Sequence, residues 1–286
     1  MFKTFSRSWE LVKASYAVLR QDKELLWFPV ISTIGVIFVS IVFSIPLFIS
    51  GLVEAISSGG EPTGAQTVIG LVIAFAFYFV MYTIIIFSNT ALIGAAMIRL
   101  NGGDPTVQDG FRIASERINA ILGYAAISAT VGVILSAIRD EDNILSQIFA
   151  GILETAWNLI VFMVVPVLVV ENVGPIEAIK RSTSLLKRTW GEQLTGTFSM
   201  GLIFGLLTFA AILVIGLPVI LLASATSSPV IMVLGVIIVI LVVMGISLFG
   251  SALNGIFQAA LYRYATEGQA GEFFDESMLA GAFRHK

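Results

Sequence analysis

The sequence contains one stretch, Gln193–Tyr262, in which no side chain is charged at neutral pH. The hydrocarbon core of a bilayer is about 30 Å thick, and an apolar helix of roughly 20 residues crosses it. This stretch is too long for one crossing, and Ser224–Pro229 divides it, because small polar residues and a proline favour a turn. Shorter runs with no charge, or with Glu154 alone, precede it. We therefore predict six transmembrane helices, at about residues 25–53, 66–98, 118–138, 144–170, 193–223 and 229–262.

The composition supports a membrane protein and excludes several other classes. Hydrophobic residues make up 57% of the chain and charged residues 12%, whereas a soluble protein has about 25% charged residues. This number of charged residues is too small to cover the surface of a soluble enzyme. It also excludes a disordered chain and a protein that binds nucleic acid. We predict an all-α polytopic membrane protein in which residues 1–286 form a single integral membrane domain.

Residue types that carry common enzymatic chemistry are nearly absent. The chain has no cysteine, its one histidine is His285, and it has neither a phosphate-binding Gly-Lys-Ser/Thr loop nor a dinucleotide fingerprint. A zinc site with histidine or cysteine ligands and a Ser-His-Asp triad are therefore not expected. Asp140-Glu141-Asp142 is interpreted as a solvated loop rather than a cation site. We predict no catalytic residue, metal or cofactor, and no enzymatic activity.

Lysine and arginine are unevenly distributed among the segments that flank the predicted spans. Of the 16 cationic residues, all but Arg139 lie in the N-terminal segment, the 2–3 and 4–5 connections or the C-terminal segment. Cytoplasmic segments retain cationic residues because these resist translocation. We therefore expect both termini in the cytoplasm.

Three of these segments have the apolar spacing of amphipathic helices, at about residues 2–20, 105–117 and 175–190. In the second, Asp104 is expected to be the N-cap and Pro105 the first helical residue. Such helices lie in the headgroup region, with apolar side chains toward the lipid and cations toward anionic headgroups. The predicted partners are anionic lipids of the cytoplasmic face, and the candidate headgroup contacts are Lys180, Arg181, Lys187, Arg188 and Arg112.

Each amphipathic helix precedes a pair of spans, which suggests three repeated units that begin near residues 2, 105 and 175. Their joints Asn101–Pro105 and Asn172–Pro175 are similar, and so are Ala95–Arg99 and Ala259–Arg263. Internal repetition is common in membrane proteins. Reuse of basic amphipathic connectors explains the same pattern, and both interpretations remain open.

Polar side chains gather on one face of span four and on one face of span six. They are Gln147, Glu154 and Asn158 with Trp157 beside them on span four, and Ser251, Asn254 and Gln258 on span six; Asn89 is a polar residue of span two. Polar groups in lipid are costly, so these faces are expected to point into the bundle or toward water. One interpretation is a polar cleft between spans four and six that carries the charge of Glu154. The other is hydrogen bonding between helices, with Glu154 near the outer surface.

Small residues recur at the four-residue spacing that lets helices approach closely. They are Gly201 and Gly205, then Ser128, Gly132 and Ser136, and also Ala91 and Ala95. Packing within the chain is the favoured interpretation, and a homo-oligomer is the alternative.

Residues 6–15 (SRSWELVKAS) and 19–29 (LRQDKELLWFP) resemble the opening of a family of uncharacterised prokaryotic six-span membrane proteins. This resemblance implies a location in the prokaryotic inner membrane and no assigned function. Residues 256–265 (IFQAALYRYA) are more faintly similar to the membrane domain attached to some glycerophosphodiester phosphodiesterases. Their catalytic domain is missing from this chain, so the similarity implies no hydrolase activity and transfers no site residue.

Two functions are compatible with these features. The first is a transporter-like or lipid-handling bundle that uses the polar cleft between spans four and six. The alternative is a non-transporting membrane scaffold, or an accessory subunit with a protein partner. The polar stripes favour the first hypothesis, and the abundance of small-residue faces favours the second.

Overall fold

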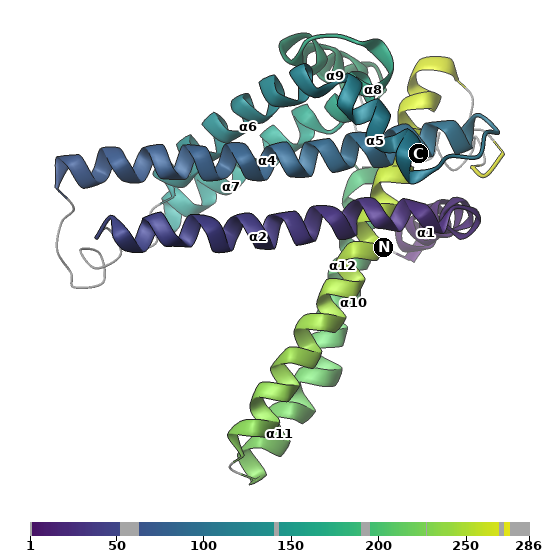
Figure 1. Cartoon of the computed structure of the whole chain (residues 1–286). Coiled ribbons are helices and arrows are strands. Elements are labelled where there is room, and N and C mark those ends of the chain that lie inside the picture. The colour runs from purple at the N-terminus through teal and green to yellow at the C-terminus, as the bar shows by residue number, and fades with distance from the viewer. Residues whose placement is uncertain are drawn as a thin grey trace. The chain divides into compact units, whose positions relative to one another are not determined.

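The computed structural model describes residues 2–51, 63–139, 143–189, 195–226, 228–268 and 272–274. Within these ranges every regular element is helical and none is a strand (Figure 1). Six helical segments are long and apolar enough to cross a membrane: Lys23–Ile49, Gly64–Leu100, Ile118–Ile138, Ile144–Glu171, Ile203–Thr226 and Pro229–Glu267. The prediction of an all-α chain with six long apolar helices is confirmed.

The chain divides into two compact units. Unit 1 consists of Met1–Pro29, Ala96–Pro105 and Thr189–Lys286, and unit 2 consists of Val30–Ala95 and Thr106–Arg188. Each unit is described by itself. That the whole chain forms one membrane domain stays a prediction.

Unit 2 contains most of the first two predicted hairpins and the two later amphipathic helices. Its elements are α2 (Trp27–Ile49), α4 (Gly64–Leu100), α5 (Val107–Glu116), α6 (Ile118–Ile138), α7 (Ile144–Val161), α8 (Val164–Glu171) and α9 (Pro175–Thr189). Glycines fix how closely its helices approach. A Cβ atom at Gly35 of α2 would lie 3.0 Å from Ile84 of α4, and one at Gly132 of α6 would lie 3.4 Å from Tyr82 of α4.

Helix α5 begins later than the sequence predicts. Its N-cap is Thr106, whose hydroxyl accepts a hydrogen bond from the Asp109 N–H while the Asp109 carboxylate accepts from the Thr106 N–H. This capping box satisfies two backbone donors at once, so the prediction that Asp104 is the N-cap and Pro105 the first helical residue is wrong. Hydrogen bonds from the Thr106 hydroxyl and N–H hold the pKa of Asp109 below its ordinary value.

The fourth apolar segment is broken between α7 and α8. Pro166 has no N–H for the helix ladder, and its ring crowds the turn before it, which breaks the helix at Phe162 and Met163. Ser182 of α9 satisfies the freed backbone groups. Its hydroxyl donates to the Ile160 carbonyl at 2.6 Å and accepts from the Met163 N–H at 3.1 Å. A buried serine thereby attaches α9 to span four.

Unit 1 is built around the last hairpin. Its elements are α1 (Phe2–Gln21), the 3-10 turn η1 (Lys23–Leu26), α10 (Thr195–Ala211), the π-helical turn η2 (Ile212–Gly216), α11 (Leu217–Thr226) and α12 (Pro229–Glu267). Gly235 of α12 leaves room for Val219 of α11, and Gly250 of α12 leaves room for Phe204 of α10. Helix α1 contacts both α10 and α12 and buries Leu11, Val18 and Leu19.

Burial changes along α12. From Pro229 to Phe249 no described residue except Gly235 is buried, and Val230 and Met232 are among the exposed apolar side chains. From Gly250 to Tyr262 most residues are buried. The first part is about 30 Å long at 1.5 Å per residue, which equals the thickness of a hydrocarbon core. The second part is covered by protein.

The three amphipathic helices follow one packing rule. Helix α5 packs on α4 of the first hairpin, with Phe111 stacked on Phe87 at 5.9 Å. Helix α9 packs on the second hairpin through Ser182 and through Pro175, which fills the space beside Gly123 of α6. Helix α1 packs on the third hairpin. The predicted amphipathic segments are therefore helices whose small or apolar faces contact protein; their position at a membrane interface stays a prediction.

The contact between α4 and α5 yields a stability test. A Cβ atom at Gly94 would lie 2.9 Å from Ile113 of α5, so Gly94→Leu overpacks this interface and is expected to lower the free energy of unfolding by about 1–3 kcal/mol. Thermal unfolding of the purified protein in detergent measures the effect. Gly245→Leu is the matched control, because no described atom lies within 4 Å of a Cβ there. Equal stability of the two variants would contradict this packing.

Candidate functional site

The polar face of α7 is exposed on unit 2. We use this name for Gln147, Glu154 and Asn158, all of which are exposed, while Trp157 beside them is half-buried. Gly151 on the same face has no described atom within 4 Å of an added Cβ. Asn143 caps the helix, since its side-chain oxygen accepts from the Leu145 and Ser146 N–H groups at 3.0 and 3.4 Å. Helix α7 thus exposes polar side chains next to exposed apolar side chains of the same helix.

Glu154 is paired with a cation. Its carboxylate accepts a hydrogen bond from the Arg139 guanidinium at 2.7 Å, and both side chains are about half exposed. From sequence, Arg139 belongs to the loop and Glu154 is an isolated acid within a span. The structure brings them together because the Arg139 guanidinium, one residue past the end of α6 at Ile138, reaches the carboxylate in the middle of α7.

Two tyrosines of α4 face α6, the helix that ends just before Arg139. Tyr78 and Tyr82 stack with ring centroids 6.2 Å apart, and both border Gly132 of α6. Asn89 lies further along α4 toward its C-terminal end and is half-buried. Unit 2 thus contributes a charge pair and phenol groups from α4, α6 and α7.

The predicted stripe of span six lies on α12 in unit 1. Ser251 is exposed, and Asn254 and Gln258 are half-buried. Because α7 belongs to unit 2, the polar cleft between spans four and six stays a prediction.

The candidate headgroup contacts are of two kinds. Lys180 and Lys187 are exposed on α9. Arg181 and Arg112 are instead paired with carboxylates: Arg181 Nε donates to Glu171 at 3.0 Å, and Arg112 donates to Asp109 at 2.8 Å. The Arg188 side chain lies outside the described residues, as do Trp190 and the acidic loop at residues 140–142.

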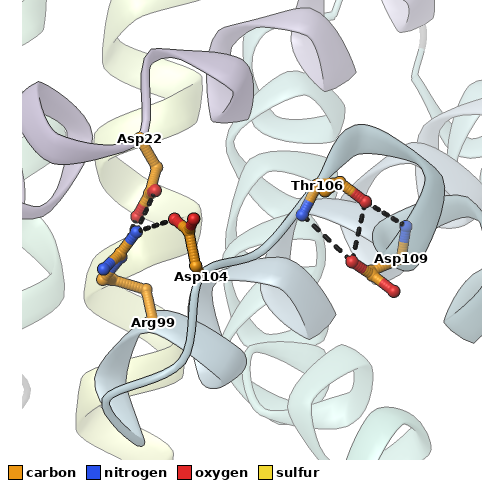
Figure 2. Close-up of polar contacts among 5 residues, drawn as sticks. All are labelled: Asp22, Arg99, Asp104, Thr106 and Asp109. Carbon is orange, nitrogen blue, oxygen red and sulfur yellow. Dashed lines mark hydrogen bonds and ion pairs between the residues drawn. The ribbon is translucent and has the colours of Figure 1, made fainter.

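A charge cluster that was not predicted lies at the C-terminal end of α4. The Arg99 guanidinium donates two hydrogen bonds to Asp22, which follows α1, and a third to Asp104 at 2.6 Å (Figure 2). Asp22 is buried and Asp104 is fully exposed. Arg263 at the corresponding end of α12 donates to the Leu100 carbonyl and to Glu267. The sequence shows that charged residues flank the apolar runs. It does not show which of them form ion pairs, because the partners lie far apart along the chain.

Arg117 makes a similar connection in unit 2. It lies between α5 and α6, and its guanidinium donates to the Asn172 side chain and to the Val169 carbonyl at the end of α8. Asn172 has a left-handed backbone conformation, which ends the helix. In both units the residue after an amphipathic helix is bonded to the end of a later apolar helix.

The small-residue motifs have different environments. Ala91 and Ala95 are fully buried, Ser128 is buried and Gly132 contacts tyrosine side chains, so these residues serve packing within the chain. Gly201 and Gly205 of α10 differ, because no described atom lies within 4 Å of a Cβ at either position.

A protein family described as a family of unknown function, DUF6159, matches residues 68–273. The matched region begins after residues 6–29, which carried the resemblance to six-span membrane proteins. No curated protein matches the chain. The similarity of residues 256–265 to a phosphodiesterase membrane domain finds no support in these comparisons.

The charge cluster yields a second stability test. Arg99→Ala leaves the buried Asp22 carboxylate without its guanidinium partner and is expected to destabilise the protein by about 3 kcal/mol or more. Asp104→Asn removes a fully exposed partner of the same arginine and is expected to change stability by less than about 1 kcal/mol. Thermal unfolding in detergent compares the two. Similar losses in both variants would show that burial of Asp22 does not matter.

Proposed function

The chain belongs to the DUF6159 family, and on that premise we propose that it is a multi-pass protein of the prokaryotic inner membrane that binds lipids or other amphiphiles along the polar face of α7. Both termini lie in the cytoplasm in this proposal, and α1, α5 and α9 lie at the cytoplasmic interface. The activity is binding or movement of an amphiphile rather than enzymatic chemistry.

Exposed apolar side chains support insertion in a bilayer. On α2 the exposed residues include Ile34, Phe38, Ile41 and Phe48, and α12 exposes a further apolar surface of bilayer length. Transfer of apolar surface out of water is favourable by about 25 cal/mol for each square ångström. A surface of this kind is unfavourable in water and favourable in lipid.

The observation that carries the amphiphile proposal is the mixed surface of α7. Glu154 and Asn158 are exposed on the same helix as Ile148, Phe149 and Ile152, which are also exposed. Lipid chains are suited to the apolar part of this surface, and a headgroup is suited to the polar part.

Native mass spectrometry of the protein released from nanodiscs made with native lipid tests this proposal. We expect a bound amphiphile in the wild type and a several-fold lower occupancy in Asn158→Leu, which makes the polar face apolar. Ile152→Leu on the apolar surface of the same helix is the control and is expected to retain the ligand. Equal occupancy in all three proteins, or no bound amphiphile in the wild type, would overturn the proposal.

The proposed headgroup contacts of α9 have their own test. Lys180 and Lys187 are exposed, while Ala178, Ser182 and Leu185 of the same helix are buried. A basic residue near an anionic surface contributes about 1 kcal/mol, so Lys180→Gln/Lys187→Gln is expected to weaken retention of phosphatidylglycerol about tenfold or more. Lys180→Arg/Lys187→Arg keeps the charge and is expected to match the wild type. Competition between phosphatidylglycerol and phosphatidylcholine in mixed nanodiscs measures the difference.

The alternative function, a membrane scaffold or accessory subunit, is favoured by Gly201 and Gly205. Their open face suits close approach of another helix. The nanodisc experiment separates the two proposals, because a scaffold is expected to retain a stoichiometric protein or a second copy of the chain instead of a small amphiphile.

A further inference from the structure

Helix α6 ends short of the start of α4 in unit 2. Gly132 of α6 borders Tyr82 of α4, and Arg139 follows Gly132 by about 10 Å along the helix. From Tyr82, α4 extends about 27 Å in the same direction to its start at Gly64. Helix α7 likewise begins at Ile144, about 15 Å beyond the level of Glu154. The Arg139–Glu154 pair therefore lies about 15 Å inward of the outer ends of both helices.

Helix α2 gives a shorter estimate from an independent contact. Gly35 borders Ile84 of α4, and α2 extends from Gly35 to Ile49 by about 21 Å. Measured outward from the level of Ile84, the ion pair lies about 8 Å inward of the end of α2. Helices α2, α4 and α7 thus all extend further outward than the charge pair.

Large apolar side chains are exposed on the surface beyond the ion pair, together with Gln147 of the polar face. On α7 the relative exposures of Ile144 and Leu145 are 73% and 77%, and on α4 those of Val68 and Val72 are 61% and 63%. Such surface belongs in hydrocarbon, which places the boundary of the hydrocarbon core outward of Arg139 and Glu154 wherever lipid contacts these helices.

Two kinds of polar group then lie at a depth where lipid does not satisfy them. The first is the half-exposed ion pair, since charges in hydrocarbon are costly even when they are paired. The second is the end of α6, because the last carbonyl groups of a helix lack partners within it. Unpaired backbone groups exposed to lipid are strongly unfavourable. Both kinds require polar partners beside the end of α6.

We propose that the outer leaflet thins beside the end of α6, so that phospholipid headgroups descend to the Arg139–Glu154 pair and a lipid phosphate binds Arg139. Arginine is suited to this contact because its guanidinium binds phosphate through two parallel hydrogen bonds. The inference rests on the proposed membrane orientation and amphiphile binding, and it names a phospholipid phosphate as the group recognised at this end of the polar face.

Single-cysteine accessibility tests the thinning. The chain has no cysteine, so Ser136→Cys near the end of α6 and Ile41→Cys at the same depth on α2 each introduce the sole thiol. Both positions are exposed. In vesicles of phosphatidylethanolamine and phosphatidylglycerol, we expect a charged, membrane-impermeant thiol reagent to label Ser136→Cys on the order of tenfold faster, because the thiolate forms only where water reaches it. Equal rates would overturn the proposal.

Fluorescence quenching then separates headgroups from water alone. A fluorophore on Ser136→Cys is expected to be quenched more strongly by lipids with a nitroxide on the headgroup than by lipids with a nitroxide deep in the acyl chain, and Ile41→Cys is expected to show the reverse. Arg139→Gln/Glu154→Gln in the Ser136→Cys protein is expected to reduce headgroup quenching several-fold. Labelling without headgroup quenching, or quenching that the double substitution leaves unchanged, would overturn phosphate binding.

Failure here is distinguishable from failure of the proposed function. Amphiphile retention that depends on Asn158, together with equal labelling at the two cysteines, would remove the thinned leaflet and leave amphiphile binding intact.

Discussion

A helix withdrawn from water must satisfy its backbone polar groups within the protein, and the arrangement of this chain follows from where that becomes difficult. Long regular helices such as α12 meet the requirement along their exposed, bilayer-length part. Difficulties arise at helix ends and breaks, and there the structure supplies polar side chains. Ser182 bonds the broken backbone of span four, Arg117 bonds the end of α8, and Arg263 bonds the Leu100 carbonyl at the end of α4.

The six apolar helices and the three amphipathic helices were predictable because both follow from local composition and periodicity. The contacts between these helices were not predictable. The Asp22–Arg99 pair joins residues far apart in sequence, and the attachment of α9 to span four depends on a break at Pro166 that the hydropathy of residues 144–170 does not reveal. Proline in this run was a readable signal. The role of Ser182, which bonds the backbone at this break, was not predictable, because a serine on an amphipathic helix has many ordinary roles.

The polar face of α7 illustrates the same limit at the candidate site. Helical spacing groups Gln147, Glu154 and Asn158 on one face of the helix, and all three side chains are exposed. The sequence does not show that Glu154 meets Arg139, because this depends on how far α6 extends relative to α7, and only contacts between helices determine that level. The depth of a charge in a membrane protein is therefore a property of neighbouring helices as much as of its own.

The packing of α1 on the last hairpin has a consequence for biosynthesis. Ribosomes make α1 first, whereas α10 and α12, which it contacts, are made last. Until translation is nearly complete, Leu11, Val18 and Leu19 have no access to these partners. During that interval these side chains need another apolar surface or a chaperone to cover them, and α1 docks only after α12 has been made.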